Sequence, residues 1–135
     1  MQPLHSIPYG YVRTANHSFE DTVRNIEAAL RNEGFGVLCQ IDIQAKLKEK
    51  LGIDFQKYVI LGACNPPLAH RALEKEINLG LLLPCNVVVY ETGSEVRVGS
   101  VDAQKMLSIV ESPEMEEMAR LVNEKLRRAV DAVVT

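Results

Sequence analysis

The sequence predicts a single α+β domain, in which helices pack on one face of a mainly antiparallel sheet. Three observations support this prediction. A chain of 135 residues is about the length of one domain. Its segments follow the order β-α-β-(α)-β-α-β-β-α, with fewer helices than a strict βαβ array requires. The two strands expected within 85–101 are joined by a short turn and form a hairpin. We therefore predict one domain over residues 1–135, with a flexible N-terminal segment at 1–6.

The composition excludes several classes of protein. Apolar residues make up 47% of the chain and charged residues 24%, which is typical of a globular fold and not of a disordered or fibrous one. The net charge of -3 argues against a nucleic-acid binder or an anionic-membrane binder. No apolar run suits a signal peptide or reaches the ~20 residues of a membrane-spanning helix. Three cysteines are too few for a disulfide framework and indicate free thiols in the cytoplasm.

The first third of the chain is expected to form two strands around a helix. Residues 7–14 form a weakly alternating strand, whose proline and glycine suit a sheet edge or a bulge. A helix begins at Ser18, continues as an apolar stripe with spacings of three and four, and ends at Gly34. The next strand, 35–43, alternates apolar and polar residues, so that one of its faces, including Cys39, is expected in the core.

The middle of the chain is expected to contain a central strand and a second long helix. One or two helical turns over 44–52 come first. The strand at 58–64 is apolar on both faces, which is typical of a buried position. Asn65 as N-cap and Pro66 in the first turn then begin a helix that continues to Gly80.

The last third is expected to form a hairpin followed by the longest helix. A long apolar strand covers 81–91 and is interrupted by Pro84, which cannot donate to a sheet ladder. The chain turns back into a strand over 95–101, and a helical turn follows at 102–107. Ser112 caps the final helix, whose apolar face repeats at spacings of three and four.

Two cysteines and a histidine are the strongest candidates for a functional site. Cys64 ends a strand directly before a helix N-terminus, a position that lowers the pKa of a thiol. His70 lies within that helix. A helix over 67–77 leads the chain about 16 Å away at 1.5 Å per residue, and residues 81–84 can return it about 13 Å. Cys85 can therefore lie near Cys64 if their strands are neighbours.

These residue types support more than one interpretation. Two thiols and an imidazole can bind zinc or another soft metal, and the thiols can also act as a redox pair. Alternatively, Cys64 and Cys85 simply fill the core, since cysteine is among the most buried residue types. Cys39 is in phase with Val37 and Ile41, so a core position is predicted for it.

Two stretches of the chain resemble a known family. The segments ILGACNPPLAHRAL and GLLLPCNVVVY are similar to the prokaryotic family of domains of unknown function numbered three hundred and two, and the resemblance covers about residues 19–133. It implies a curved antiparallel sheet with helices on one side, as in the TATA-box-binding-protein-like fold, and cytoplasmic homodimers. No activity is established for that family. The resemblance marks as ligand-binding residues Cys64, Asn65, His70, Cys85 and Asn86.

Three hypotheses about function follow. The first is a non-enzymatic homodimer that holds a small ligand or a metal at Cys64, His70 and Cys85. The second is a thiol- or sulfur-handling enzyme with Cys64 as the nucleophile, assisted by His70 or Cys85. The third is a purely structural or protein-interaction domain. In all three we expect no nucleic-acid partner and no membrane partner.

Overall fold

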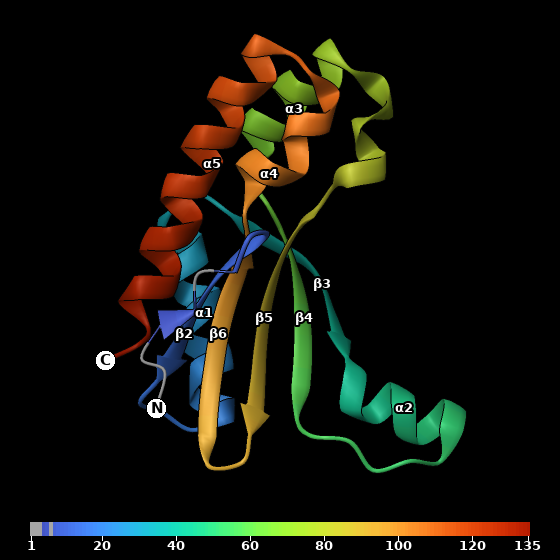
Figure 1. Ribbon diagram of the computed structural model, residues 1–135, viewed down its shortest axis with the longest axis vertical. Helices are drawn as coiled ribbons and strands as arrows, with labels where there is room; N and C mark the ends of the chain where they lie inside the picture. The colour runs from blue at the N-terminus through green and yellow to red at the C-terminus, as the bar shows by residue number, and fades with distance from the viewer. Residues whose placement is uncertain (1–3, 6) are drawn as a thin grey trace.

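An open antiparallel sheet with helices on one face forms the body of the molecule (Figure 1). The computed structural model describes residues 4, 5 and 7–135. Neighbouring strands in the order β1-β2-β6-β5-β4-β3 are all antiparallel. This confirms the predicted α+β class. The strands are β1 (Leu4–His5), β2 (Gly10–Ala15), β3 (Gly36–Asp42), β4 (Tyr58–Cys64), β5 (Cys85–Thr92) and β6 (Glu95–Val101).

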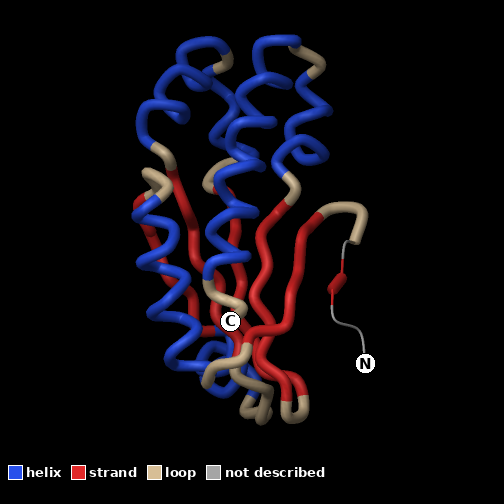
Figure 2. The backbone as a smooth tube through the Cα atoms, turned by 90° about the vertical axis from the view of Figure 1, so that its left-hand side faces the viewer, coloured by secondary structure: helices blue, strands red, loops and turns tan. Residues whose placement is uncertain are grey.

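The helices occupy three places around the sheet. Helices α1 (Phe19–Asn32) and α5 (Pro113–Ala132) cover one face, and α2 (Ile43–Leu51) projects beyond β3 (Figure 1). We call the remaining helical elements, together with the first turns of α5, the helical cap; Figure 2 shows helices beyond one end of the strands. No helix in the described part of the chain is long and apolar enough to cross a membrane. The cap elements are α3 (Pro66–Lys75), η1 (Ile77–Leu82), α4 (Ala103–Leu107) and η2 (Ser108–Val110).

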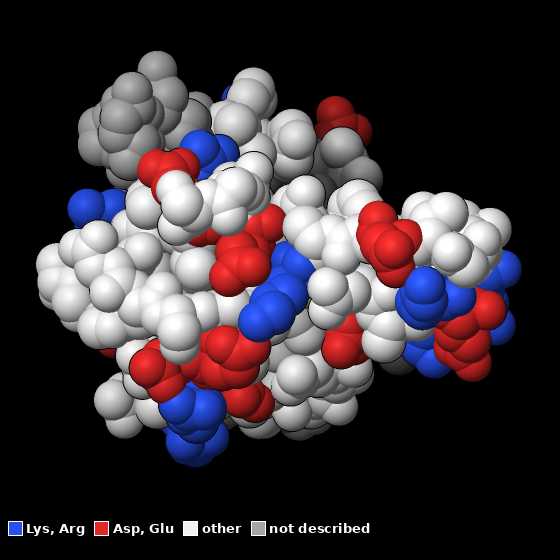
Figure 3. All heavy atoms as spheres, turned by 90° about the horizontal axis from the view of Figure 1, so that it is seen from below, with Lys and Arg blue, Asp and Glu red and all other residues white. Residues whose placement is uncertain are grey.

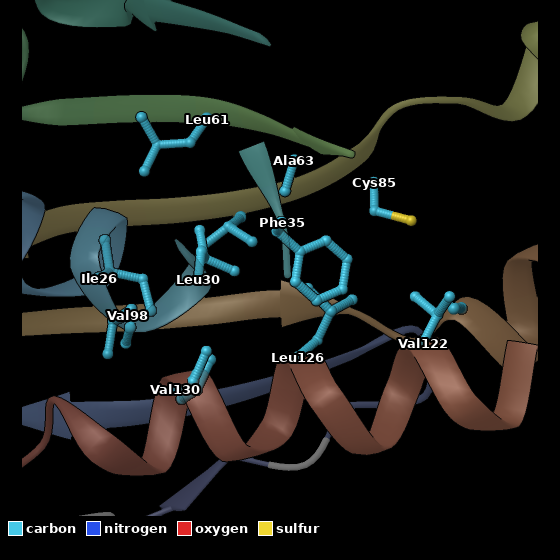
Figure 4. Packing of buried hydrophobic residues seen from close by; sticks show 14 of the residues in the cluster. Ile26, Leu30, Phe35, Leu61, Ala63, Cys85, Val98, Val122, Leu126 and Val130 are labelled. Atoms are coloured by element: carbon cyan, nitrogen blue, oxygen red, sulfur yellow. The ribbon is translucent and has the colours of Figure 1, made fainter. Parts of the chain in front are cut away.

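The main core lies between the sheet and the helices α1 and α5. Every second side chain of the inner strands points toward these helices, as the two-residue period of a strand requires. Figure 4 shows this packing, with strand side chains facing those of both helices. Among the buried residues that meet there are Ile26, Leu30, Leu61, Val87, Val89, Val98, Leu126 and Val130.

Side-chain caps begin the helices where the sequence indicates. The side chains of Ser18, Asn65 and Ser112 each accept a backbone N–H from the first helical turn. These three starts confirm the prediction. Asp42 caps α2 in the same way, and Ile43 therefore begins this helix instead of extending the strand predicted over 35–43.

The largest difference from the predicted elements lies between the second long helix and the hairpin. The helix expected to continue to Gly80 ends at Lys75, and a 3-10 helix, η1, follows it. The strand expected over 81–91 begins only at Cys85. Pro84 has no N–H to donate, so ladder pairing starts after it, and the preceding leucines belong to the helical cap.

The N-terminal prediction differs in two respects. The strand expected over 7–14 is β2, at Gly10–Ala15, and it is not at the edge, because Leu4–His5 pairs with it. The segment 1–6 was predicted to be flexible. Of this segment, residues 1–3 and 6 lie outside the described residues.

The prediction that Cys39 lies in the core is wrong, because its thiol side chain is exposed. The register of β3 shifts between Val37 and Cys39, as in a β-bulge, and this breaks the alternation on which the prediction relied. Cys39 lies opposite Gly62, where an added Cβ would be only 2.7 Å from its Sγ. Both residues are therefore on the same face of the sheet, which α1 and α5 leave uncovered.

One buried polar side chain joins α4 to α5. Asn123 accepts the N–H of Ala103 at 2.7 Å and donates to Asp102 and Gln104 at 3.0 and 3.2 Å. We expect Asn123→Leu to lower the free energy of unfolding by about 1–3 kcal/mol in urea denaturation, because it leaves the Ala103 N–H without a partner. Glu124→Ala, on the exposed side of the same helix, should change it by less than about 1 kcal/mol. Equal stabilities of the two variants would contradict this role for Asn123.

Candidate functional site

A cavity of about 250 Å³ lies between the helical cap and the ends of β3, β4 and β5. Strand ends supply one wall, including Cys64 and Cys85, while α3, η1 and the first turns of α5 supply the others. Most of the lining is aliphatic or aromatic. Its apolar residues include Phe35, Leu68, Leu73, Leu79, Met115 and Val122.

The two thiols of the predicted site line this same cavity. Cys85 lies at the start of β5, directly opposite Ala63 of β4, and Cys64 is the next residue along β4. The chain leaves Cys64 through α3 and η1 and returns to the same end of the sheet at Cys85, along the route that the sequence allows.

Both thiols titrate above the ordinary range of cysteine. Burial, with a smaller contribution from the nearby Cys64, raises the pKa of Cys85 to about 11. Burial also raises the pKa of Cys64. The prediction that the helix N-terminus lowers the pKa of Cys64 is therefore wrong in sign. At neutral pH the cavity contains two protonated thiols.

The N-terminus of α3 does not offer free N–H groups to Cys64. The first two helical residues, Pro66 and Pro67, have no N–H. The next N–H, of Leu68, donates to the Asn65 side chain at 3.3 Å. Because these groups are missing or already bonded, desolvation of the thiolate outweighs stabilisation by the helix.

His70 lies away from the two thiols. Its side chain is exposed, with Nε2 at 3.7 Å from Oε2 of Glu74 one turn further along α3, and it does not line the cavity. The predicted set of Cys64, His70 and Cys85 is thus not assembled as a metal site. Among the residues whose side chains the structure describes, 7–135, no group of three or more His, Cys, Asp or Glu side chains could hold a metal ion.

The two asparagines of the predicted site lie in different places. Asn65 lines the cavity while its side chain caps α3. Asn86 is exposed and lies opposite Gly62, on the uncovered face of the sheet. There it lines a separate groove with Tyr58 and Tyr90, whose rings stack 5.3 Å apart. Only Asn65 therefore belongs with the thiols.

Sequence reasoning did not find the apolar majority of the site. Leu38, at the bulge of β3, lines the cavity although its side chain is 66% exposed. Leu79 enters from η1, in a segment predicted as the end of a long helix. These residues come from separate segments without a shared motif, and no sequence pattern links them. The register shift in β3 and the end of α3 at Lys75 bring them together in the folded chain.

Charged side chains lie away from this cavity, on surfaces such as the one that Figure 3 shows from below. There acidic side chains lie among basic ones. Basic residues in and after α2 have acidic neighbours, because Lys48 pairs with Asp54 at 3.0 Å and Lys57 with Glu20 at 2.8 Å. Such exposed pairs contribute little to stability and are typical of a solvated surface.

The fold and the site define a class of protein. It is a small α+β domain with an open antiparallel sheet and, at one end of that sheet, an apolar cavity whose lining includes two thiols. The chain belongs to the DUF302 family, a domain of unknown function, whose model matches residues 11–133. This confirms the resemblance seen in the sequence. The crystal structure of an uncharacterized conserved DUF302 protein from Bacillus stearothermophilus is similar, with a TM-score of 0.88 and 31% identity, covering 94% of this chain and 99% of that chain. No curated protein matches the chain.

Proposed function

We propose that this protein is a non-enzymatic binding protein whose small-molecule ligand occupies the cavity walled by Cys64 and Cys85. The cavity itself carries the proposal. About 250 Å³ of space, partly open to solvent, lies between the cap and the sheet. Concave, mostly apolar sites with a few polar groups are the usual form of small-molecule pockets.

The alternative of a thiol enzyme fits the structure less well. A nucleophilic cysteine needs a lowered pKa or an adjacent base, whereas burial raises the pKa of both Cys64 and Cys85. The histidine expected to assist, His70, is exposed on α3 and outside the cavity lining. Cys64 and Cys85 are therefore better explained as residues that line a binding site than as nucleophiles.

The reactivity of Cys64 separates these two functions. For a binding protein, we expect the rate of Cys64 alkylation by iodoacetamide to rise with pH and to have its midpoint above that of a free thiol, because burial raises the pKa of Cys64. Peptide mapping by mass spectrometry follows each of the three cysteines separately. The same chain in concentrated urea is the control, where Cys64 should show the ordinary titration of a free thiol. A midpoint near neutral pH would restore the thiol-enzyme hypothesis.

Filling the cavity tests the proposed function directly. Ala72 of α3 is buried and lines the cavity, so Ala72→Phe places a ring in the ligand's space. In a thermal-shift screen of neutral, anionic and cationic fragments, at least one class should raise the Tm of the natural protein and leave that of Ala72→Phe unchanged. A ligand at 100 times its Kd stabilises by about 2.7 kcal/mol, which such a screen detects.

The control for this screen is Ala132→Phe, an exposed position at the end of α5 outside the cavity lining. It should respond to the same fragments as the natural protein. Circular dichroism checks that each variant is folded. If no fragment class stabilises the natural protein, or if Ala72→Phe responds equally, the proposal fails.

We also propose, from the family resemblance, that the protein acts as a homodimer in a prokaryotic cytoplasm. Apolar side chains on the uncovered face of the sheet, including the exposed Ile41 and the half-buried Val88, support this association. Sedimentation equilibrium should give a dimer that Val88→Glu dissociates, and a monomer at all concentrations would contradict it. The likeness to the TATA-box-binding-protein-like fold stays a prediction.

A further inference from the structure

The size of the cavity limits the size of its ligand. An engineered cavity of about 150 Å³ in another protein holds one benzene molecule. By proportion, the 250 Å³ here suit a molecule of roughly ten non-hydrogen atoms, which is the size of two fused six-membered rings.

The lining offers no partner for a charged group of a ligand. Among the described residues that line the cavity, none is Lys, Arg, His, Asp or Glu. Of the ionised groups on the elements around the cavity, Lys75 of α3 and Glu114 of α5 pair with each other at the surface at 2.9 Å. A buried ionised group without a partner is strongly disfavoured, so an ion in this cavity would have nothing to offset its loss of hydration.

Sulfur atoms are concentrated in this lining. Two of the three cysteines and two of the four methionines of the chain line this one cavity. They are Cys64, Cys85, Met115 and Met118. Polarizable sulfur makes favourable contacts with aromatic rings, often at the ring edge, and a saturated ring does not provide these contacts. The lining therefore favours an aromatic molecule over an aliphatic one of equal size.

The position of Leu38 indicates where the ligand enters. Among the large hydrophobic residues of the lining, Leu38 is the one whose side chain is mainly exposed, at 66%. It lies at the β-bulge of the edge strand β3, and bulges commonly re-aim a side chain beside a functional site. A large apolar side chain held at a cavity rim in this way narrows the opening.

From these observations we propose that the ligand is a neutral aromatic molecule of roughly ten non-hydrogen atoms, and that it reaches the cavity past Leu38 at the edge of the sheet. This inference rests on the proposed binding function and specifies its ligand class. It assigns no chemical step to the protein. The cavity recognises its ligand by shape, absence of charge and sulfur–ring contacts.

Three compounds with the same ring skeleton test the ligand class in isothermal titration calorimetry at pH 7. They are 2-naphthol, its saturated analogue decahydro-2-naphthol, and the anion 2-naphthoate. We expect 2-naphthol to bind at one molecule per chain, the saturated analogue to bind about fivefold more weakly, and the anion to bind at least about 100-fold more weakly. An equal or tighter affinity for either of the other two compounds would overturn the inference.

Matched methionine variants test the sulfur contacts. Met115→Leu with Met118→Leu removes two sulfurs from the lining while nearly keeping side-chain volume. This double variant should weaken 2-naphthol about fivefold and leave decahydro-2-naphthol unchanged. Met106→Leu, outside the lining, should change neither affinity. Equal weakening of both compounds would mean that packing, and not sulfur, determines the preference, and would overturn the aromatic class.

Two further variants test the route into the cavity. Leu38→Ala should speed both association and dissociation of 2-naphthol several-fold in stopped-flow fluorescence, which the absence of tryptophan in this chain simplifies. Leu51→Ala, at the end of α2, equally exposed and outside the lining, is the control and should change neither rate. Unchanged rates in Leu38→Ala would contradict this route.

The outcomes separate this inference from the proposed function. If the fragment screen finds a cavity ligand but 2-naphthol does not bind, the ligand class is wrong and the binding function stands. If no fragment of any class binds, both fail. If 2-naphthol binds equally to Ala72→Phe, its site lies elsewhere, for example in the tyrosine groove of the uncovered sheet face, and the inference is overturned.

Discussion

Replacing Leu126 by alanine is expected to lower the free energy of unfolding by about 3–5 kcal/mol. Leu126 is fully buried and points from α5 into the cluster that includes Phe35 and Leu30 (Figure 4). The truncation removes apolar contacts and leaves a space, because a close-packed core relaxes only partly around it. Urea denaturation measures the loss.

Leu51→Ala is the matched control, because Leu51 is 66% exposed near the end of α2 and contributes to no core. We expect this substitution to change the free energy of unfolding by less than about 0.5 kcal/mol. The difference between these two leucines tests whether α5 holds the sheet and its helices together. A loss below about 1 kcal/mol in Leu126→Ala would show that this packing is looser than the structure indicates.

Raising the pH from 8.5 to 11 is expected to remove about 2 kcal/mol of stability through Cys85 alone. The unfolded chain releases the Cys85 proton near pH 9.0, whereas burial holds the pKa of the folded thiol at about 11. Between these values the unfolded state loses its proton and the folded state keeps it. The contribution is therefore complete below pH 9 and disappears as the pH rises toward 11.

Cys85→Ala isolates this contribution from the tyrosines and lysines that titrate in the same range. The variant is less stable at pH 8, because it lacks a buried side-chain atom. Its free energy of unfolding should nevertheless fall less steeply with pH, so that the difference from the natural protein shrinks between pH 9 and 11. Parallel curves for the two proteins would show that Cys85 titrates normally and is not buried in solution.

Local sequence signals predicted the class of the fold and most element starts correctly. The caps Ser18, Asn65 and Ser112 begin helices where expected, because a capping side chain needs only backbone N–H groups two or three residues away. The hairpin of β5 and β6 turns at Gly93, whose φ of 61° suits glycine. These interactions join residues close in the chain, and the sequence displays both partners together.

The end of α3 and the start of β5 were harder to predict. Residues 81–84 are apolar and suit either a strand or a buried turn, and periodicity alone does not distinguish the two. Pairing with β4 starts only at Cys85, after Pro84. The leucines before Pro84 take positions that depend on the space beneath the helical cap. Segments that are distant in sequence form that space.

The candidate site divides in the same way. The sequence by itself identified Cys64 and Cys85 as residues of a candidate functional site, because the two stretches that resemble the family contain them. The tertiary structure decided that both thiols line one apolar cavity, and that His70 faces solvent. It also reversed the predicted pKa of Cys64, since burial depends on what surrounds a thiol and not on its place before a helix.

For this protein, the sequence alone thus determined the α+β class, the helix caps, the hairpin and the family, because each rests on patterns between neighbouring residues. Only the tertiary structure decided the exposure of Cys39, the protonated state of Cys64 and Cys85, and the cavity they share. The physical reason is that burial and cavity shape are properties of the space between elements. That space is set by the β3 bulge and the helical cap, whose effects are absent from any single segment of the chain.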